Sequence, residues 1–274
     1  MKPIQQQVAL VTGATDGLGR GVATELARRG ATVLLHGRDA SKLEATRTAI
    51  ARDSSNSRLR TYRADFASLE QIRSLAANII EHEPQLDVLV NNAGIGVEQS
   101  RRTSEDALEL TFQVDYLSTY MLSRLLLPLL KTSAPARIVN VASAGQAPID
   151  FRDPLLEQQW NGVQAYCQAK LAQIMLTVDM ARELEGENVT VNALHPASYM
   201  PTKIVVGMFG VQSTLEEGVQ AVVRLACSPE VEGVSGRYFD RQRAARPNAQ
   251  ALDAEARRKL AQLSAKLTNV PAKA

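Results

Sequence analysis

The sequence predicts an α/β protein in which a parallel sheet of about seven strands lies between helices. Short runs rich in β-branched residues alternate with segments whose apolar residues recur at helical spacing. Strands that alternate with helices favour a parallel sheet covered on both faces, a three-layer α/β/α arrangement. A chain of 274 residues with 45% hydrophobic residues is large enough to bury the core of such a sheet.

The predicted strands, in chain order, are residues 8–12, 32–35, 59–64, 87–90, 137–141, 189–193 and 237–239. Helical spacing appears in Leu18, Val22 and Leu26, in Leu43 and Ile50, in Ile72, Leu75 and Ile79, and over the longer ranges 104–131, 163–184 and 215–226. No repeat, low-complexity tract or long linker interrupts the alternation. We therefore expect residues 1–240 to form a single domain.

The tail, residues 241–274, departs from this pattern. It is polar and rich in alanine, with Leu260, Leu263 and Leu267 at helical spacing. We expect a terminal helix that packs on the body of the protein or on a partner.

Charge and composition point to a small-molecule partner. The 31 basic and 29 acidic residues are spread along the chain and leave a net charge of +2, so nucleic acid and a membrane surface are not expected partners. The N-terminus has no long apolar run, which predicts a cytoplasmic protein. Cys167 and Cys227 are too few for a metal cluster and lack a redox spacing, so no metal is expected.

A glycine-rich stretch, TGATDGLGR at residues 12–20, joins the first predicted strand to a helix. Gly13, Gly17 and Gly19 permit a sharp turn and let phosphates approach the backbone at the helix N-terminus. The alternative is a tight strand-to-helix turn with Asp16 as its N-cap.

The stretch AYCQAK places Tyr166 and Lys170 one helical turn apart. A phenol has a reference pKa of about 10, and an adjacent ammonium favours phenolate. Ser143, in VNVASAG, adds a hydroxyl after a predicted strand. The alternatives are a partly exposed helix face for the first pair and a turn residue for Ser143.

Five motifs together resemble the short-chain dehydrogenase/reductase family. They are TGxxxGxG at 12–19, NNAG at 91–94, Ser143 in VNVASAG, Tyr-x-x-x-Lys at 166–170 and VNALHP at 191–196. The resemblance runs from about residue 7 to residue 239, and HGRD at 36–39 with the long insert before Tyr166 is similar to the retinol-dehydrogenase-like carbonyl reductases. It implies a Rossmann-type doubly wound sheet, a nicotinamide cofactor and a carbonyl/alcohol reaction.

The resemblance also implies catalytic roles. Tyr166 exchanges the substrate proton, Ser143 holds the substrate oxygen and Lys170 contacts the nicotinamide ribose. Asp115, in FQVDYLSTY, stands where the family usually has an asparagine that helps hold a relay water. We expect its charge to compete for Lys170. The alternative is a solvated or locally paired aspartate on a long helix.

Cofactor choice is expected at the end of the second strand. By resemblance Arg38 lies beside the adenosine ribose, where its guanidinium suits a 2′-phosphate, so NADP(H) is favoured and NAD(H) is the alternative. Asp39 is expected to cap the next helix. His36 either stacks near the adenine or lies on the surface without a role.

The resemblance assigns further cofactor contacts to the glycine turn and to later strand ends: Gly13, Thr15, Asp16, Gly17, Leu18, Gly19, Asp65, Phe66, Asn92, Ala93, Gly94, Tyr166, Lys170, Pro196 and Thr202. Asp65 is expected to bind the adenine amino group, with a strand-end turn residue as the alternative. Asn91 and Gly94 match positions near the central strand and the cofactor ribose. Asn192 and His195 are expected to satisfy buried backbone groups.

Two segments are candidates for the substrate pocket. Residues 199–209 contain several large apolar side chains and form either a lid over a hydrophobic ligand or a core-packing helix. The insert between Gly145 and Gly162 holds Trp160, which either walls the pocket or anchors a long loop. We expect a fairly hydrophobic ketone or aldehyde as substrate.

Two other functions stand beside a carbonyl reductase. Asp115 motivates a nucleotide-binding sensor or scaffold without useful turnover. A sugar-nucleotide epimerase or dehydratase shares Tyr-x-x-x-Lys, but the glycine spacing and the short C-terminal region count against it. Helices 104–131 and 163–184 resemble those through which family members pair, which predicts a homodimer or homotetramer; the alternative is that they only cover the sheet.

Overall fold

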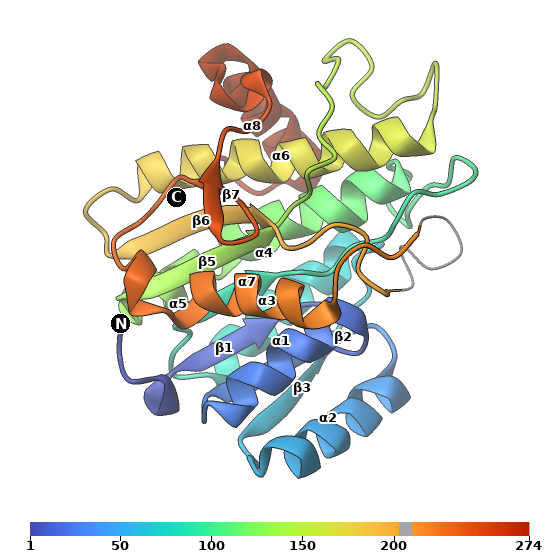
Figure 1. Cartoon of the computed structure of the whole chain (residues 1–274). Helices are drawn as coiled ribbons and strands as arrows, with labels where there is room; N and C mark the ends of the chain where they lie inside the picture. Colours follow the sequence, from blue (N-terminus) through green and yellow to red (C-terminus); the bar gives the residue numbers. More distant parts are fainter. Residues whose placement is uncertain (203–209, 274) are drawn as a thin grey trace.

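One eight-stranded sheet forms the middle layer of the protein (Figure 1). The computed structural model describes residues 1–202 and 210–273. The strand order is β3-β2-β1-β4-β5-β6-β7-β8, and all neighbours are parallel except β7 and β8. The strands are β1 Val8–Val11, β2 Thr32–Gly37, β3 Leu59–Arg63, β4 Val88–Asn91, β5 Ala136–Val141, β6 Val189–His195, β7 Tyr238–Asp240 and β8 Arg243–Ala245.

The α/β prediction is confirmed, with one strand more than expected. The chain reverses after β7 at Arg241, which has a φ of 54°, and β8 then pairs antiparallel with β7. The sequence of β8 has no alternation of apolar residues that would predict a strand. It pairs with β7 because the chain reverses direction at Arg241.

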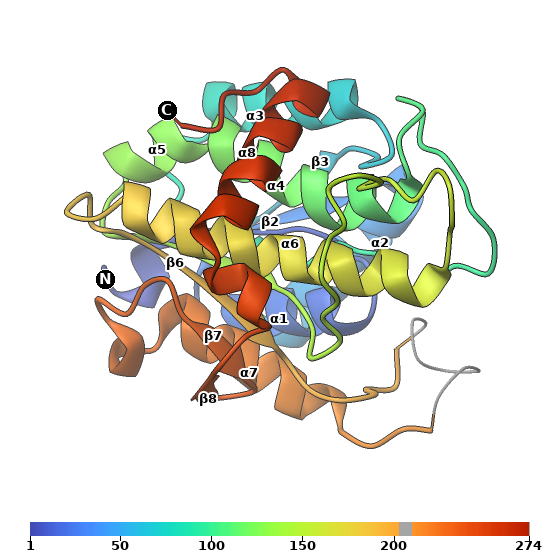
Figure 2. The ribbon, with the colours of Figure 1, turned by 90° about the horizontal axis from the view of Figure 1, so that it is seen from above.

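Helices cover both faces of the sheet (Figures 1 and 2). One layer contains α1 Gly17–Arg28, α2 Ala40–Ser54 and α7 Leu215–Cys227, and the other contains α3 Leu69–His82, α4 Ser118–Leu125, α5 Leu127–Thr132 and α6 Gly162–Glu183. Alternate residues of β1 enter different cores, Ala9 and Val11 on one face and Val8 and Leu10 on the other. This double burial explains why the strands read as continuous apolar runs.

The helix predicted over residues 104–131 is shorter and interrupted. Residues 104–109 form a turn in which the Ser104 hydroxyl accepts hydrogen bonds from the backbone N–H groups of Asp106 and Leu108. A π-helical segment, Phe112–Leu117, precedes α4. The break between α4 and α5 lies beside Pro128, which has no N–H to continue the hydrogen-bond ladder.

The tail forms α8, Ala254–Thr268, which crosses the outer side of α6 and α4 (Figure 2). Tyr116 Oη lies 2.6 Å from Ser264 Oγ, and the Tyr120 hydroxyl donates to the Val270 carbonyl at 2.8 Å. The tail helix therefore packs on its own chain. It covers the face of α4 and α6 that was predicted to pair with another copy, and the homodimer or homotetramer stays a prediction.

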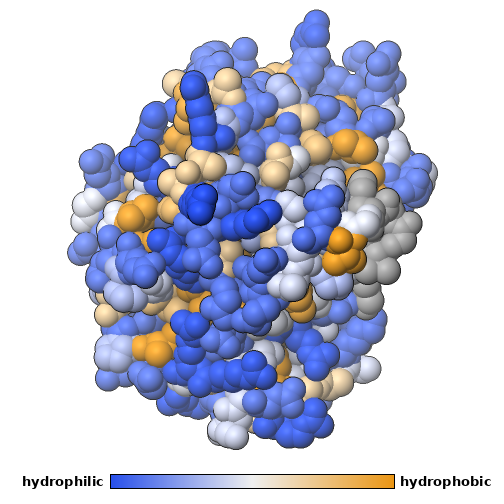
Figure 3. All heavy atoms as spheres, viewed as in Figure 1, coloured by the Kyte–Doolittle hydropathy of each residue, from blue (hydrophilic) through white to orange (hydrophobic). Residues whose placement is uncertain are grey.

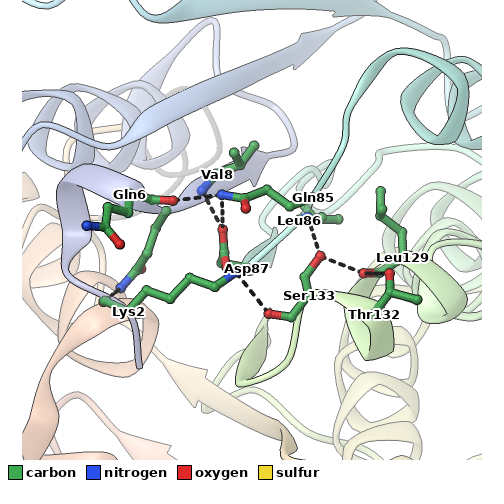
Figure 4. A network of polar contacts seen from close by, with 10 residues as sticks. Lys2, Gln6, Val8, Gln85, Leu86, Asp87, Leu129, Thr132 and Ser133 are labelled. Carbon is green, nitrogen blue, oxygen red and sulfur yellow. Dashed lines mark hydrogen bonds and ion pairs between the residues drawn. The ribbon is translucent and has the colours of Figure 1, made fainter.

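A polar network ties the N-terminal segment to the amino ends of β1 and β4 (Figure 4). The fully buried carboxylate of Asp87 accepts hydrogen bonds from the Val8 N–H at 2.7 Å and from Gln85 Nε2 at 3.1 Å. Its other oxygen lies 2.7 Å from Lys2 Nζ. A buried carboxylate with three partners holds the edge opposite the glycine turn in register.

The surface shows no broad apolar area on the face in Figure 3, where hydrophobic side chains form small separate groups. Over the described ranges 1–202 and 210–273, no helix is long and apolar enough to span a membrane. Within the same ranges, no group of three or more His, Cys, Asp or Glu side chains is placed to hold a metal ion.

Candidate active site

The glycine turn follows β1, which lies between β2 and β4 at the point where the strand order reverses. Open parallel sheets bind ligands at the carboxyl ends of their strands at such a point. Gly13 and Gly17 have φ values of 66° and 49°, which favour glycine. A Cβ at Gly19 would overlap the carbonyl oxygen of Gly13 and the side-chain amide of Asn92. The backbone at Gly19 therefore lies too close to the Gly13 carbonyl for any residue other than glycine.

The N-terminus of α1 fits a phosphate group. Helix geometry gives the N–H groups of Leu18 and Gly19 no intrahelical acceptor, and the helix dipole is positive here. The Asp16 carboxylate accepts from the Gly17 N–H at 2.9 Å, so Asp16 does cap the helix. The capping alternative and a phosphate site are compatible, because the cap occupies one of several donors.

Two threonines border this turn. Thr15 Cγ2 lies 2.8 Å from where a Cβ on Gly37 would stand, and Thr202 Cγ2 lies 3.3 Å from the equivalent point on Gly17. Segments that are far apart in the sequence therefore meet at the glycine turn. Pro196 is buried just beyond the end of β6. The hydroxyl-bearing residues, the glycines and the helix N-terminus together suit the pyrophosphate of a dinucleotide.

The NNAG motif holds the turn from behind. The Thr12 hydroxyl accepts hydrogen bonds from the backbone N–H groups of Asn92 and Ala93, both at 2.9 Å. The side-chain amide of Asn92 donates to the Thr12 carbonyl at 2.8 Å. Asn91 is buried and donates to Asn140 Oδ1 at 2.8 Å. These amides shape the turn, and direct cofactor contacts by Asn92, Ala93 and Gly94 stay predictions.

His36 is buried beneath the turn, so its predicted surface placement is wrong, and stacking near the adenine stays a prediction. Nδ1 accepts from the Gly13 N–H at 3.2 Å, Nε2 lies 3.1 Å from the Ala64 carbonyl, and the ring stacks on Phe66 at 4.2 Å. Burial lowers the pKa of His36 to about 4. The neutral ring therefore supports the glycine turn from inside.

Two exposed arginines end neighbouring strands. Arg38 follows β2 and Arg63 ends β3, in the register that pairs Gly37 with Arg63. Arg63 Nε donates to the Arg38 carbonyl at 3.1 Å. Asp39 caps α2, as predicted, by accepting from the Lys42 N–H at 3.0 Å. Sequence reasoning missed Arg63, although parallel pairing of these strands would have placed it there.

Asp65 lies beyond β3, where its carboxylate accepts from the Ala67 N–H at 2.9 Å. This contact is the strand-end turn of the alternative interpretation. Adenine recognition by Asp65 and Phe66 stays a prediction. Phe66 is buried against His36, and its ring therefore serves the core.

Ser143, Tyr166 and Lys170 come together at the carboxyl edge of the sheet. Ser143 follows β5, and the other two lie one turn apart on α6. Ser143 Oγ and Tyr166 Cε1 lie 3.5 and 3.9 Å from the point where a Cβ on Gly145 would stand, and Lys170 Nζ lies 5.5 Å from the centre of the Tyr166 ring. Burial raises the pKa of Tyr166, while the Lys170 ammonium and the nearby Ser143 hydroxyl oppose that rise. Lys170 is only 5% exposed, so the exposed-face alternative is wrong for the lysine.

Asp115 lies fully buried in the π-helical segment. Oδ1 accepts from the Ile95 N–H at 2.7 Å, and Oδ2 lies 3.0 Å from Lys170 Nζ. Burial raises the pKa of Asp115 against the opposing charge of Lys170. Burial also disfavours the Lys170 ammonium, but the charges of Asp115 and Tyr166 outweigh it and raise the pKa of Lys170. The solvated alternative is wrong, and the expected competition for Lys170 is confirmed.

The predicted contacts with backbone groups are confirmed for Asn192, whereas the His195 ring contacts a side-chain hydroxyl instead. Asn192 donates to the Val234 carbonyl at 2.7 Å and accepts from the Arg237 N–H at 3.1 Å. His195 Nε2 lies 3.0 Å from Ser198 Oγ.

The insert before α6 is anchored by Trp160, whose Nε1 donates to Glu109 Oε1 at 3.2 Å. The anchoring alternative therefore holds for the indole. The predicted lid at 199–209 lies mostly outside the described residues, which omit 203–209. Of its described part, Met200 is buried against Gly218 and Leu18.

A glycine turn at the strand-order reversal, with a serine, a tyrosine and a lysine grouped at the same edge, defines a dinucleotide-binding oxidoreductase site. The family model described as short chain dehydrogenase matches residues 7–208. The chain belongs to the short-chain dehydrogenase/reductase family, in its retinol-dehydrogenase-like branch, and is an oxidoreductase of that family. Family members bind nicotinamide cofactors, and the residues at the turn fit one.

Relatives and solved structures agree with this assignment. The chain is similar to human retinol dehydrogenase 13, with 37% identity over 98% of this chain and 86% of the relative. It is also similar to a short-chain dehydrogenase from Shigella flexneri complexed with NADP, with TM-score 0.71, 27% identity, and 87% and 98% of the two chains covered. A 3-ketoacyl-(acyl-carrier-protein) reductase from Brucella melitensis complexed with NADH matches with TM-score 0.70, 25% identity, and 86% and 97% covered.

Proposed function

We propose that the protein is an NADP(H)-dependent oxidoreductase that interconverts a hydrophobic ketone or aldehyde and its alcohol. One observation carries this proposal. The Tyr166 phenol lies beside Ser143 and the Lys170 ammonium, at the sheet edge that also holds the glycine turn. A phenol between a hydroxyl and a buried cation suits proton exchange with a carbonyl oxygen.

In reduction, the carbonyl carbon receives a hydride and the oxygen receives a proton. A nicotinamide cofactor bound at the glycine turn supplies the hydride. Tyr166 gives its phenolic proton to the oxygen, while the Ser143 hydroxyl donates a hydrogen bond to the negative charge that develops there. Lys170 stabilises the phenolate that remains. Alcohol oxidation reverses these transfers, with the Tyr166 phenolate as the base.

The preference for NADP(H) is supported by Arg38, which directly follows β2, and by Arg63, whose Nε donates to the Arg38 carbonyl. One similar solved structure is complexed with NADP and another with NADH, and arginines at this strand end favour the cofactor that carries a 2′-phosphate. Arg38→Ala should weaken NADPH binding about 10- to 100-fold, the size of a lost charge-assisted bond, and leave NADH affinity within about twofold.

Isothermal titration of both cofactors measures this preference. Arg52→Ala is the matched control, because Arg52 is an exposed arginine on the neighbouring α2. Equal losses of NADPH and NADH affinity would exclude recognition of a 2′-phosphate by Arg38.

A hydrophobic substrate is supported by the relatives named retinol dehydrogenases, since retinol is an apolar alcohol. The insert between Gly145 and Gly162 adds Phe151 and Leu155, which are partly buried against the core. We propose that this insert forms one wall of the substrate pocket.

Spectrophotometric assays of NADPH and NADH oxidation against a set of hydrophobic ketones and aldehydes test the proposal. Wild-type protein should turn over at least one of them, and Tyr166→Phe should lose at least about a hundredfold in kcat while still binding NADPH. Equal rates for both proteins would remove Tyr166 from the chemistry.

The alternative, a catalytically weak NADP(H)-binding sensor or scaffold, is favoured by one observation, the ion pair between Asp115 and Lys170. Cofactor binding without turnover of any carbonyl would support it. The homo-oligomer and the cytoplasmic location stay proposals, tested by light scattering on the eluted protein and by cell fractionation.

A further inference from the structure

The C-terminal segment between β8 and α8 contacts the loop that follows Ser143. After β8 it forms a short 3₁₀ helix, Ala249–Leu252, capped by Asn248. Asn248 and Gln250 face the loop that begins at Ser143. This contact joins residues more than 100 positions apart in the chain.

The backbone carbonyl of Ser143 is held by two side chains. Gln146 Nε2 and the Tyr238 hydroxyl each donate to it at 3.1 Å. Gln146 Oε1 in turn accepts from the Asn248 N–H at 2.7 Å. One glutamine therefore links the backbone of the C-terminal segment to the backbone of the serine.

Gln250 holds the next part of the same loop. Its Oε1 accepts from the Ile149 N–H at 2.7 Å, and its Nε2 donates to the Ile149 carbonyl at 3.0 Å. The side-chain amide thus satisfies both backbone groups of Ile149, whose side chain is 3% exposed. Because both its N–H and its carbonyl are hydrogen-bonded to one side chain, the Ile149 backbone is held in one position and one orientation.

The C-terminal segment is itself fixed to the body of the protein. Arg257 of α8 lies 2.6 Å from Asp179 on α6 and donates to the Ala251 carbonyl at 2.9 Å. Ser264 and Val270 contact the buried tyrosines of the π-helical segment and α4. The anchor that reaches the Ser143 loop is therefore rigid.

We propose that residues 248–250 position Ser143 and the substrate-facing insert, with Gln250 and Gln146 as positioning residues for carbonyl binding and reduction. The proposal rests on the proposed function of Ser143. Loss of the Gln250 amide frees the Ile149 backbone and lets the loop after Ser143 move, while the glycine turn and α8 keep their own contacts.

Gln250→Ala tests this inference, with Gln262→Ala as the matched control because Gln262 is an exposed glutamine on α8. Gln250→Ala should lower kcat/KM for the carbonyl at least about tenfold and leave NADPH affinity within about twofold of wild type, while Tm falls because two backbone groups of Ile149 lose their partner. Gln250→Glu places a carboxylate oxygen against the Ile149 carbonyl, so its kcat/KM should fall at least as far as in Gln250→Ala. A loss of kcat/KM no larger than in Gln262→Ala, or a loss of NADPH affinity as large as the loss of kcat/KM, would overturn the inference.

Hydrogen exchange of the Ile149 amide gives a second readout that needs no turnover. Gln250→Ala should speed this exchange at least about tenfold without changing exchange in β5 or β6. Unchanged exchange overturns the inference even in an active enzyme. Wild-type protein without turnover, but with the faster exchange in the variant, instead overturns the proposed function and leaves the mechanical link standing.

Discussion

Replacing Asp115 by asparagine measures how strongly this carboxylate controls proton exchange at Tyr166. Asparagine keeps an oxygen for the Ile95 N–H and removes the negative charge. Asp115 Oδ2 lies 3.0 Å from Lys170 Nζ, which lies 5.5 Å from the centre of the Tyr166 ring. A unit charge about 8 Å from the ring is worth about 2 kcal/mol at an effective dielectric constant near 20, or about 1.5 pH units.

The direction of the shift follows from the charges. Asp115 raises the pKa of Tyr166, so removing its charge makes the phenolate easier to form. Alcohol oxidation needs the phenolate, and its rate rises with pH through this pKa. In Asp115→Asn the midpoint should therefore move to lower pH by about 1 to 1.5 units, and oxidation below both midpoints should be about tenfold faster.

Initial rates of NADP⁺-dependent oxidation of a saturating alcohol, measured from about pH 7 to 11.5 so that the range extends above the ordinary phenol pKa of about 10, follow the midpoint. Asp53→Asn is the control, because it removes a carboxylate paired with an arginine on α2, far from the site. A midpoint that stays in place in Asp115→Asn, or moves equally in Asp53→Asn, would refute the electrostatic coupling.

Three further predictions concern the turn and the network at the opposite edge of the sheet. Gly19→Ala should abolish NADPH binding, measured by cofactor fluorescence, because the added Cβ overlaps the Gly13 carbonyl; Gly186→Ala, whose Cβ would meet nothing within 4 Å, should retain binding. The unfolding free energy should fall by up to about 3 kcal/mol as pH drops from 6.5 to about 4, because His36 is neutral when folded and charges on unfolding. Urea titrations of His36→Gln, which keeps a donor and an acceptor but does not titrate, should lack this part of the pH dependence. Asp87→Ala should lower the unfolding free energy by about 2 to 4 kcal/mol, because the Val8 N–H and the Lys2 ammonium lose their carboxylate partner. A change below about 0.5 kcal/mol would contradict this role.

Local pattern predicted most of the secondary structure because the two periodicities are properties of neighbouring residues. The strand predicted at 8–12 is β1, Val8–Val11, and the helix predicted at 163–184 is α6, Gly162–Glu183. The prediction of one long helix over residues 104–131 was wrong for a different reason. The Ser104 turn and Pro128 interrupt an apolar spacing that otherwise continues across the break.

In the candidate site, too, some residues could be predicted from local pattern and others could not. Motif order and spacing were sufficient to select Ser143, Tyr166 and Lys170, which the structure groups together. The position of His36 was not predictable, since whether its ring faces adenine, solvent or the underside of the turn depends on Phe66 and Ala64, which lie just after β3.

The sequence by itself determined the alternation of strands and helices, the glycine turn and the residues available for proton exchange, because each depends on residue type and short spacing. Only the tertiary structure decided that Asp115 pairs with Lys170, that α8 covers α4 and α6, and that Gln250 holds Ile149. Each of those contacts joins residues more than 50 positions apart. Such partners are chosen by packing across the sheet and its helices, which no local pattern records.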